Sequence, residues 1–230
     1  MRKLTLADGR RIAWREAGSG PVVILLHGWS MSSAVFAEAI EEMAADFRLL
    51  APDLRGHGGS DPGTDYGLAD FAADLAEWIQ LLDLREVALL GWSLGGQVAL
   101  ELVPALRDRL RRLVLIGTTP RFTAAADWSA GLPDLQVRAM ARDLRRNYLK
   151  SMGDFFALQF AGEDLPRERY RYIVDFAVRG GRLPEPEAAL AALETLRMAD
   201  LRSALTEVDL PVLVQHGELD RITLPGAADY

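Results

Sequence analysis

The sequence predicts an α/β fold, with a mostly parallel sheet, helices on both of its faces and an inserted helical cap. Continuous apolar runs such as "PVVILLHG" alternate along the chain with stretches whose apolar residues recur at helical spacing. Continuous apolar runs are typical of strands buried on both faces, and strand–helix alternation indicates parallel strands joined by crossover helices. The alternation stops after Thr118 and resumes in "VDLPVLVQHG". A helical insertion at this point predicts a lid over the carboxyl ends of the strands, where open α/β sheets bind ligands.

Local patterns justify each element of the first half in turn. "KLTLADGRRIAWREAG" predicts two alternating strands with a hairpin turn at Asp8 and Gly9. Ser32 or Ser33 is expected to cap a helix over 35–45, "FRLLAPD" is the next strand, and "RGHGGSDPG" is a loop rich in glycine. "LADFAADLAEWIQLL" has helical spacing. "EVALLGWS", "LGGQVALELVPAL" and "RRLVLIG" then predict a strand, a helix and a strand.

This pattern divides the chain into a sheet domain and a cap. The sheet domain comprises residues 1–118 and 195–230, and the cap comprises residues 119–194. Glycine and proline residues break the cap into short helices, and no apolar run within it reads as a buried strand. After the cap, the apolar run 212–214 is expected to form a buried strand.

Composition narrows the class of protein. Half of the 230 residues are hydrophobic, which predicts a globular chain with a substantial core. The net charge of −7 argues against nucleic acid as a partner. The chain has no cysteine and three scattered histidines, so we expect no disulfide, no metal site and no cofactor. Neither a signal peptide nor an apolar run of membrane-spanning length is evident, so we expect a cytoplasmic protein with no membrane contact.

The hexapeptide "GWSLGG", residues 91–96, is the motif that indicates chemistry. It follows a predicted strand and opens a predicted helix, which is the context of a G-x-S-x-G nucleophile turn. Gly91 and Gly95 lack the β-carbons that would collide in so tight a turn, and Ser93 is expected to adopt a strained backbone conformation. The following helix directs its first amides at a developing oxyanion, with the amide of Leu94 as one donor. An ordinary glycine–serine loop is the alternative, which the strand–turn–helix context disfavours.

The loop "LLHGW" after the first buried strand predicts the second oxyanion donor, the amide of Trp29. His27 in this loop and His57 in the glycine-rich loop are both expected to hold their loops through hydrogen bonds rather than to transfer protons. His216, at the last strand, is expected to be packed or hydrogen-bonded, because a triad histidine normally comes from a later loop.

Taken in order, the motifs resemble the α/β-hydrolase fold. The pieces "LLHGW", "DLRGHGGS", "LGWSLGG", the helical insertion and "VLVQHGELD" carry that resemblance along the whole chain. The pieces "GTTPRF", "ADWSAGLP", "FFALQF" and "ADLRSAL" make the chain similar to the BioH group of carboxylesterases. The resemblance implies an esterase that demethylates pimeloyl-acyl-carrier-protein methyl ester in biotin synthesis. It also implies that Ser93 is the nucleophile and that Asp220, just past the last predicted strand, is the triad acid.

The triad histidine is the missing piece of this resemblance. In this fold the order is serine, acid and then histidine, and no histidine follows Asp220. One more strand, a loop with the histidine and a closing helix would need about thirty residues. We therefore expect that the 230 residues are a truncated form of a longer chain and are inactive alone.

Within the cap, basic residues suggest a surface for a partner. The cap has as many basic as acidic residues, so the rest of the chain holds the negative charge. Basic side chains recur every four residues around 138–150, which predicts one stripe on a helix, and a second cluster lies at 167–171. An ordinary solvated helix face is the alternative, whereas the resemblance implies an acidic acyl carrier protein. The candidate carrier-binding residues are Arg138, Arg142, Lys150, Arg167 and Arg171, with Arg145 and Arg146 beside the first two.

The resemblance also places the acyl channel along the cap stretch "FFALQ". Packing of the cap against the sheet is the alternative for at least half of that stretch. The candidate substrate-binding residues are Trp29, Ser93, Leu94, Phe155, Phe156, Ala157, Leu158 and Gln159.

Two classes of function remain open. The first is a serine esterase that acts on a small acyl ester through an acyl-enzyme. Ser93 excludes relatives with an aspartate nucleophile, such as haloalkane dehalogenases, but not lactonases, broad-specificity esterases or C–C bond hydrolases. The second is a catalytically inactive binding protein of the same fold, for which the absent histidine is the main support.

Overall fold

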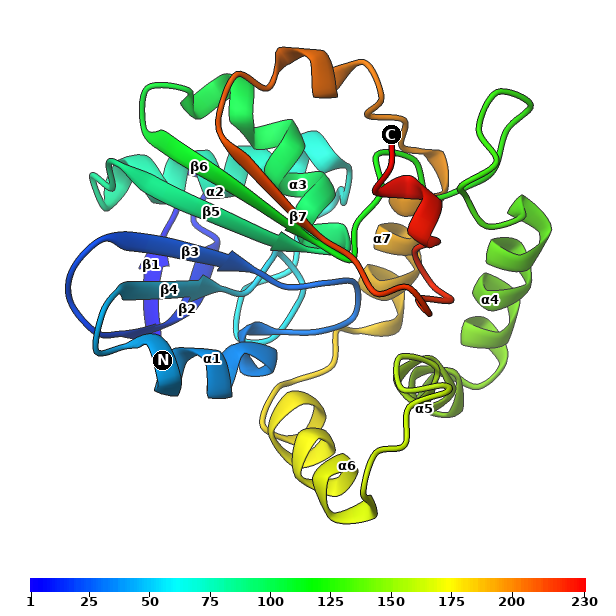
Figure 1. Ribbon diagram of the computed structural model, residues 1–230. Coiled ribbons are helices and arrows are strands. Elements are labelled where there is room, and N and C mark those ends of the chain that lie inside the picture. Colours follow the sequence, from blue (N-terminus) through cyan, green and yellow to red (C-terminus); the bar gives the residue numbers. More distant parts are fainter.

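The fold is built on a seven-stranded sheet in the order β1-β2-β4-β3-β5-β6-β7 (Figure 1). The computed structural model describes all of residues 1–230. Strands β3 to β7 are parallel to one another, whereas β1 pairs with β2 and β2 pairs with β4 in antiparallel register. The strands are β1 (Arg2–Thr5), β2 (Arg11–Ala17), β3 (Val22–Leu26), β4 (Arg48–Pro52), β5 (Val87–Trp92), β6 (Leu110–Ile116) and β7 (Val212–Gln215). The mostly parallel sheet confirms the predicted fold class.

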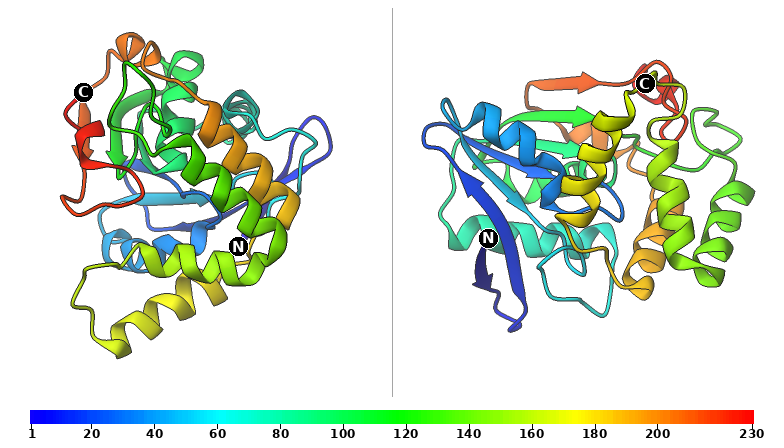
Figure 2. Two further views of the ribbon diagram at one scale, coloured as in Figure 1. Left: turned by 90° about the vertical axis from the view of Figure 1, so that its right-hand side faces the viewer. Right: turned by 90° about the horizontal axis from the view of Figure 1, so that it is seen from below.

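Helices cover both faces of the sheet and its carboxyl end. The views in Figures 1 and 2 show α1 on one face, α2 and α3 on the other, and α4, α5 and α7 beyond the arrowheads of the central strands. The helices are α1 (Ala37–Met43), α2 (Leu68–Leu81), α3 (Leu94–Leu102), α4 (Asp134–Arg146), α5 (Tyr148–Leu158), α6 (Arg167–Val174) and α7 (Pro186–Met198). The segment between β6 and β7 therefore contains helices and no sheet strand, as expected of a cap.

Sequence periodicity explains the main elements. The hairpin turn places Gly9 at φ 88°, a conformation that glycine adopts without strain. The helix expected over 35–45 begins as a 3-10 turn, Ser33–Phe36, whose cap is the Ser32 hydroxyl, 3.3 Å from the Ala34 amide nitrogen. In α2, the buried side chains recur at helical spacing and join a core of 38 residues on the α2–α3 side of the sheet.

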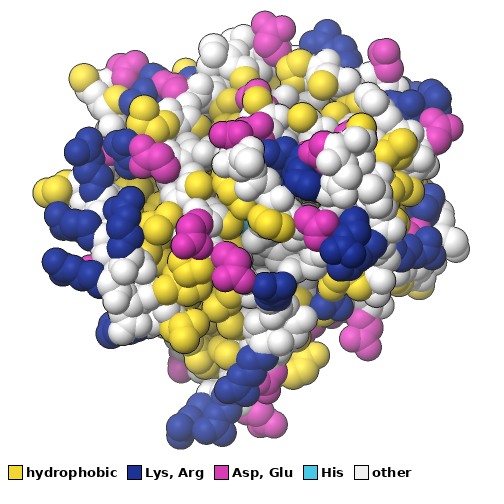
Figure 3. Space-filling view, turned by 180° about the vertical axis from the view of Figure 1, so that it is seen from behind, with side chains coloured by type: hydrophobic (Ala, Val, Ile, Leu, Met, Phe, Trp, Pro, Cys, Tyr) yellow, Lys and Arg dark blue, Asp and Glu magenta, His cyan; other side chains and the backbone are white.

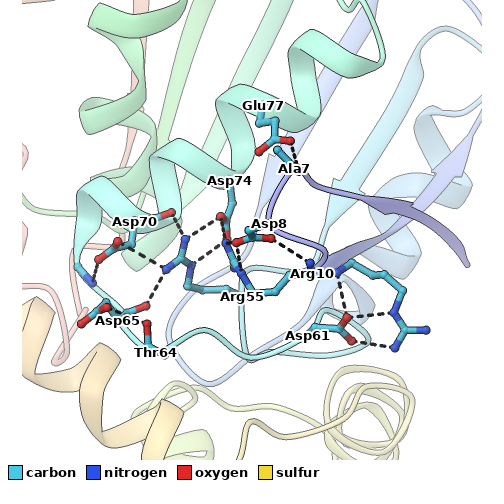
Figure 4. Close-up of polar contacts among 12 residues, drawn as sticks. Ala7, Asp8, Arg10, Arg55, Asp61, Thr64, Asp65, Asp70, Asp74 and Glu77 are labelled. Atoms are coloured by element: carbon cyan, nitrogen blue, oxygen red, sulfur yellow. Dashed lines mark hydrogen bonds and ion pairs between the residues drawn. The ribbon is translucent and has the colours of Figure 1, made fainter.

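A buried ion network joins the β1–β2 hairpin to α2 (Figure 4). The Asp74 carboxylate accepts two hydrogen bonds from the Arg10 guanidinium, at 2.8 and 2.7 Å, and two from Arg55, at 2.8 and 2.6 Å. Arg55 also donates to the carbonyl oxygens of Asp65 and Asp70. Because Arg55 follows β4, this network fixes the glycine-rich loop at the carboxyl end of the sheet.

The expectation that 212–214 forms a buried strand is wrong in one respect. The segment is strand β7, but Val212, Leu213 and Val214 are 45, 53 and 47% exposed. The reason is that β7 pairs with β6 alone, so it lies at the edge of the sheet. An apolar run predicted the strand but could not predict what covers it.

The single basic stripe expected over 138–150 is also wrong. Helix α4 ends at Arg146, and Asn147 is extended at φ −152°. The Asn147 side chain then caps α5 by accepting a hydrogen bond from the Lys150 amide at 3.2 Å. Lys150 therefore lies on a different helix from the α4 arginines. The physical reason is that asparagine is favoured at the N-cap of a helix and disfavoured in a helix interior.

The division into a sheet domain and a cap at 194/195 stays a prediction. That boundary falls inside α7, which is continuous from Pro186 to Met198. Four α7 side chains, Ala189, Ala192, Leu193 and Leu196, are buried in the main core. Helix α7 therefore packs as part of the same core as α2 and α3.

Candidate active site

Ser93 lies on a sharp turn between β5 and α3. Its backbone has φ 53° and ψ −117°, a left-handed conformation that costs energy for any residue except glycine. The Ser93 amide donates to the Ile116 carbonyl oxygen at 3.0 Å, and the Thr118 hydroxyl donates to the Ser93 carbonyl oxygen at 2.7 Å. The turn is therefore held from the neighbouring strand β6.

The two glycines of the motif are required by close backbone contacts. A β-carbon at Gly91 would lie 2.4 Å from the Gly95 carbonyl oxygen. A β-carbon at Gly95 would lie 2.2 Å from the Leu26 carbonyl oxygen, at the end of β3. No real β-carbon approaches backbone so closely, so only glycine allows α3 to start against β3 with Ser93 at the apex.

Ser93 and Asp220 line one cavity of about 440 Å³ at the carboxyl end of the sheet. The walls come from Gly28 and Trp29 of the loop after β3, from the loop 217–223 after β7, and from the cap. The structure thus brings the predicted nucleophile and the predicted acid to the same hollow, although 127 positions separate them in the sequence.

The Asp220 carboxylate is held by its own loop. Its Oδ1 accepts hydrogen bonds from the amides of Ile222, at 2.8 Å, and Thr223, at 3.0 Å. Its Oδ2 lies 2.8 Å from the Thr223 hydroxyl, which also lies 2.9 Å from the Gly117 carbonyl oxygen. The carboxylate is 24% exposed. An acid fixed in this way can orient a hydrogen-bond donor placed against its remaining free edge.

Comparison with known proteins assigns the family. The family model of the alpha/beta hydrolase fold matches residues 21–230. The chain belongs to the α/β-hydrolase family. A pimeloyl-[acyl-carrier protein] methyl ester esterase of Nitrosomonas europaea is 35% identical over 213 residues, covering 93% of this chain and 82% of that protein. The protein of the same name from Nitrosospira multiformis is 37% identical over 223 residues, with the same coverage.

A solved structure agrees with this assignment. The esterase EaEST of Exiguobacterium antarcticum superposes with a TM-score of 0.91 at 27% identity, covering 99% of this hydrolase chain and 84% of that one.

The assignment of the Trp29 and Leu94 amides as oxyanion donors stays a prediction. Neither the Trp29 nor the Leu94 amide is hydrogen-bonded to another group of the chain. The Trp29 ring is fixed by its indole N–H, which donates to the Ala189 carbonyl oxygen at 2.8 Å, and by edge-to-face packing on Phe155. The Leu94 side chain is fully buried, and Leu94 is not among the residues that line the cavity.

None of the three histidines lines the cavity of Ser93. His27 is fully buried, and its Nε2 accepts a hydrogen bond from the Leu54 amide at 3.0 Å while Nδ1 lies 2.9 Å from the Gly28 carbonyl oxygen. Because Nε2 accepts, the proton lies on Nδ1, and the ring joins the loops after β3 and β4. Burial lowers the pKa of His27.

His57 and His216 are also in structural positions. His57 is fully buried beside His27, with ring centroids 5.3 Å apart, and burial lowers its pKa to about 3. His216 lies 2.7 Å through Nε2 from the Thr223 carbonyl oxygen and 3.7 Å from Asp220 Oδ2. His216 therefore contacts the loop 217–223 but does not line the cavity.

The cap stretch 155–159 is divided between two surfaces. Phe155, Leu158 and Gln159 line the cavity, and the buried Nε2 of Gln159 has no hydrogen-bond partner. Phe156 is buried in a small cluster with Met31 and Ala177, and Ala157 is exposed. This division follows from helix geometry, since adjacent residues on α5 point to different sides.

The candidate carrier-binding residues are all exposed but differ in charge compensation. Arg138 is paired with Asp134 and Lys150 with Asp154. No carboxylate pairs with the others, which are Arg142, Arg145 and Arg146 on α4 and Arg167 and Arg171 on α6. Figure 3 shows basic side chains gathered at the left-hand edge, over α4, and at the lower tip, over α6.

Two features of the site had no place in the sequence interpretation. The Thr223 hydroxyl lies within hydrogen-bond distance of both the Asp220 carboxylate and the Gly117 carbonyl oxygen, and a threonine three residues after the acid was the available signal. A neighbouring cavity of about 430 Å³ between α4 and α5 shares Phe155, Leu158, Arg221 and Ile222 with the cavity of Ser93.

No group of three or more potential ligand side chains is placed to hold a metal ion. No helix has the length and apolar character needed to span a bilayer.

Proposed function

We propose that this chain is a serine carboxylic ester hydrolase that cleaves the methyl ester of a pimeloyl group carried on acyl carrier protein. The observation that carries the proposal is the pairing of Ser93, on its strained turn, with the fixed carboxylate of Asp220 in one cavity. The choice of substrate is supported by the relatives from Nitrosomonas and Nitrosospira, which are named for that ester.

The proposed reaction proceeds through an acyl-enzyme. The Ser93 hydroxyl loses its proton to a base and attacks the ester carbonyl carbon. The oxyanion of the tetrahedral intermediate accepts hydrogen bonds from the Trp29 and Leu94 amides. The intermediate expels methoxide, which takes the proton from the base and leaves as methanol. Water then attacks the acyl-enzyme by the same route, and the products are the free carboxylate and Ser93.

The base in this proposal is a histidine held by Asp220. It is not His27, His57 or His216, because none of them lines the cavity. In the serine–acid–histidine order of the family it follows the acid. Residues 1–230 alone should therefore turn over p-nitrophenyl butyrate at a rate on the order of a million-fold below that of a chain that carries the histidine. Turnover within tenfold of that chain, abolished by Ser93→Ala, would contradict the proposal.

Labelling identifies the nucleophile directly. A fluorophosphonate probe should label the histidine-bearing protein at Ser93, because the probe mimics the tetrahedral intermediate. Ser93→Ala should abolish labelling, whereas Ser151→Ala, which removes a serine hydroxyl from the neighbouring cavity, should leave it unchanged. Labelling that persists in Ser93→Ala would exclude Ser93 as the nucleophile.

We infer that the unpaired arginines of the cap bind the acidic carrier. Charge reversal of Arg142 and Arg146 to Glu should raise KM for the carrier-linked ester roughly three- to tenfold and weaken its salt dependence. A free methyl ester should be unaffected, since it makes no contact with the rim. Arg112→Glu, toward the amino end of β6, is the matched control. Equal losses on both esters would indicate damage to the cap instead of a lost docking surface.

A further inference from the structure

A second cavity, of about 480 Å³, shares no lining residue with the cavity of Ser93. It lies between the β1–β2 hairpin, the loop 58–62 after β4 and the connector 180–182 that leads from the cap into α7. Met1 is its one hydrophobic lining residue. A cavity so polar does not fit an acyl chain, whose binding requires apolar walls.

The charge of this cavity is positive on a negative protein. Four cationic side chains line it, against two carboxylates, Asp53 and Asp61; the cations are Lys3, Arg11, Arg15 and Arg182. Asp53 is already bound by the amides of Ser33 and Gly59. Asp61 is bound by the Arg11 guanidinium through two hydrogen bonds of 3.0 Å. Arg182 is paired with Glu185, at 2.7 Å. When Asp53, Asp61 and Glu185 are counted against the four cations, one positive charge remains in excess.

Lys3 and Arg15 are the lining cations that pair with no carboxylate, whereas Arg11 and Arg182 are paired. Lys3 faces Ala13 in the β1–β2 register, so Arg11 and Arg15, two positions to either side of Ala13, share its face of the hairpin. Arg15 contacts the chain through one guanidinium nitrogen, which donates to the Gly180 carbonyl oxygen at 3.2 Å. Its Nε is buried without a hydrogen-bond partner. A buried guanidinium N–H with no acceptor is costly unless an anion or water supplies one.

The connector adds backbone donors to the same cavity. The amides of Gly181 and Arg182 are not hydrogen-bonded within the chain. A β-carbon at Gly181 would lie 2.2 Å from the Ser32 hydroxyl oxygen, so only glycine lets the backbone approach here. Guanidinium, ammonium and free amide groups are the donors that bind phosphate oxygens, and all three kinds belong to residues that line this one polar cavity.

We propose that this cavity binds a phosphate group, as inorganic phosphate or as a phosphate monoester. The anion would accept hydrogen bonds from Arg15 Nε, the Lys3 ammonium and the connector amides. It would thereby join the hairpin of the sheet domain to the connector of the cap. The volume of the cavity, about 480 Å³, leaves room for an organic group attached to the phosphate. The site is independent of Ser93 and of the proposed ester hydrolysis.

The test uses ³¹P NMR with inorganic phosphate and with glycerol 3-phosphate as separate probes, at constant ionic strength set with chloride. The wild-type protein should broaden the signal saturably, and sulfate should compete with it. The double variant Lys3→Gln/Arg15→Gln should bind at least about tenfold more weakly, because two charge-assisted hydrogen bonds are lost. Arg112→Gln removes a positive charge elsewhere and should bind as the wild type does. The probe that binds more tightly identifies the source of the phosphate group.

Two outcomes would overturn the proposal. One is the absence of saturable, sulfate-competed broadening by the wild-type protein for both probes, a result that needs no variant. The other is equal weakening by Arg112→Gln and by the double variant, which would show a nonspecific electrostatic effect only. A double variant that fails to fold is replaced by Arg15→Lys, which keeps the charge but loses the Nε–H donor and should still weaken binding.

Discussion

Replacing Asp74 by asparagine should destabilise the whole fold. The substitution keeps the size of the side chain and removes the charge that two arginines share. Asp74 and Arg55 have side chains that are 9 and 8% exposed. Arg55 would be left as a buried cation whose remaining carboxylate, that of Asp70, lies 3.6 Å away and is 40% exposed. Arg10, at 22% exposed, would lose its partner on α2 and with it the tie between hairpin and helix.

The magnitude follows from these burials. Removing one partner of a buried ion pair costs about 3–5 kcal/mol of unfolding free energy. Arg55 would keep two acceptors, the Asp65 carbonyl oxygen at 2.8 Å and the Asp70 carbonyl oxygen at 2.7 Å, so the cost should fall at or just below the lower end of that range. We expect Asp74→Asn to cost about 2–3 kcal/mol. For a chain of this size that corresponds to a fall in Tm of roughly 4–12 °C.

Urea unfolding and thermal unfolding measure the effect, with Asp83→Asn as the control. Asp83 also pairs with two arginines, Arg85 and Arg109, but its side chain is 69% exposed, so its loss should change stability little. Equal effects of the two substitutions would refute the argument from burial. A loss below about 0.5 kcal/mol for Asp74→Asn would refute it as well.

The pH dependence offers a second check on Asp74. Burial raises the pKa of Asp74, but hydrogen bonds from Arg10 and Arg55 outweigh burial and lower that pKa overall. A carboxyl group with a lowered pKa contributes stability above its unfolded pKa of about 3.9 and loses it as the pH falls through the folded value. The difference between wild type and Asp74→Asn should therefore shrink below about pH 4.

Two further predictions concern the glycines and the buried histidines. Gly95→Ala should lower the free energy of unfolding by at least about 3 kcal/mol and abolish fluorophosphonate labelling, because its β-carbon would meet the Leu26 backbone. Gly153→Ala on α5, with open space around it, should raise that free energy by about 0.5–1 kcal/mol. Denaturant titrations that rank the two variants in the opposite order would contradict these contacts. Burial lowers the pKa of His57 to about 3 and also lowers the pKa of His27. Stability should therefore be complete above the unfolded pKa of about 6.5 and decline as the pH falls below it, with His57 accounting for about 2 kcal/mol between pH 7.5 and 5. Urea unfolding of wild type and His57→Leu at both pH values should show a smaller pH effect in the variant.

Short-range constraints explain what could be predicted from the sequence. The order of strands and helices follows from periodicity, and the turn at Ser93 follows from two glycines whose absent β-carbons are required within a few residues. The pairing of Ser93 with Asp220 was implied by the resemblance to the α/β-hydrolase fold. The structure accounts for it, because Ser93 comes directly after β5, Asp220 comes five residues after the end of β7, and the carboxyl ends of parallel strands meet at one edge of a sheet.

Features that depend on neighbours could not be predicted in this way. The exposure of β7 depends on which elements lie beside it, and an apolar run does not encode that. The break between α4 and α5 depends on one side-chain hydrogen bond, which Asn147 Oδ1 accepts from the Lys150 amide and which a four-residue spacing of basic residues does not reveal. The cavity lined by Lys3 and Arg15 is formed by the amino-terminal hairpin together with residues 180–182, which are far away in the sequence, and no sequence motif marks it.

The arrangement around Ser93 argues for catalysis over binding. A non-glycine residue at φ 53° costs on the order of 1–3 kcal/mol of stability. The fold keeps Ser93 in this conformation with the help of Gly91 and Gly95, two positions where only glycine fits. Two amides of its own loop donate to Asp220 Oδ1, and the Thr223 hydroxyl lies 2.8 Å from Oδ2, which holds the carboxylate beside the same cavity. A binding pocket would gain nothing from a strained serine, an oriented carboxylate and two amides left without acceptors. A histidine held between Ser93 and Asp220 would use all of them at once, so the arrangement fits the proposed ester hydrolysis better than it fits binding alone.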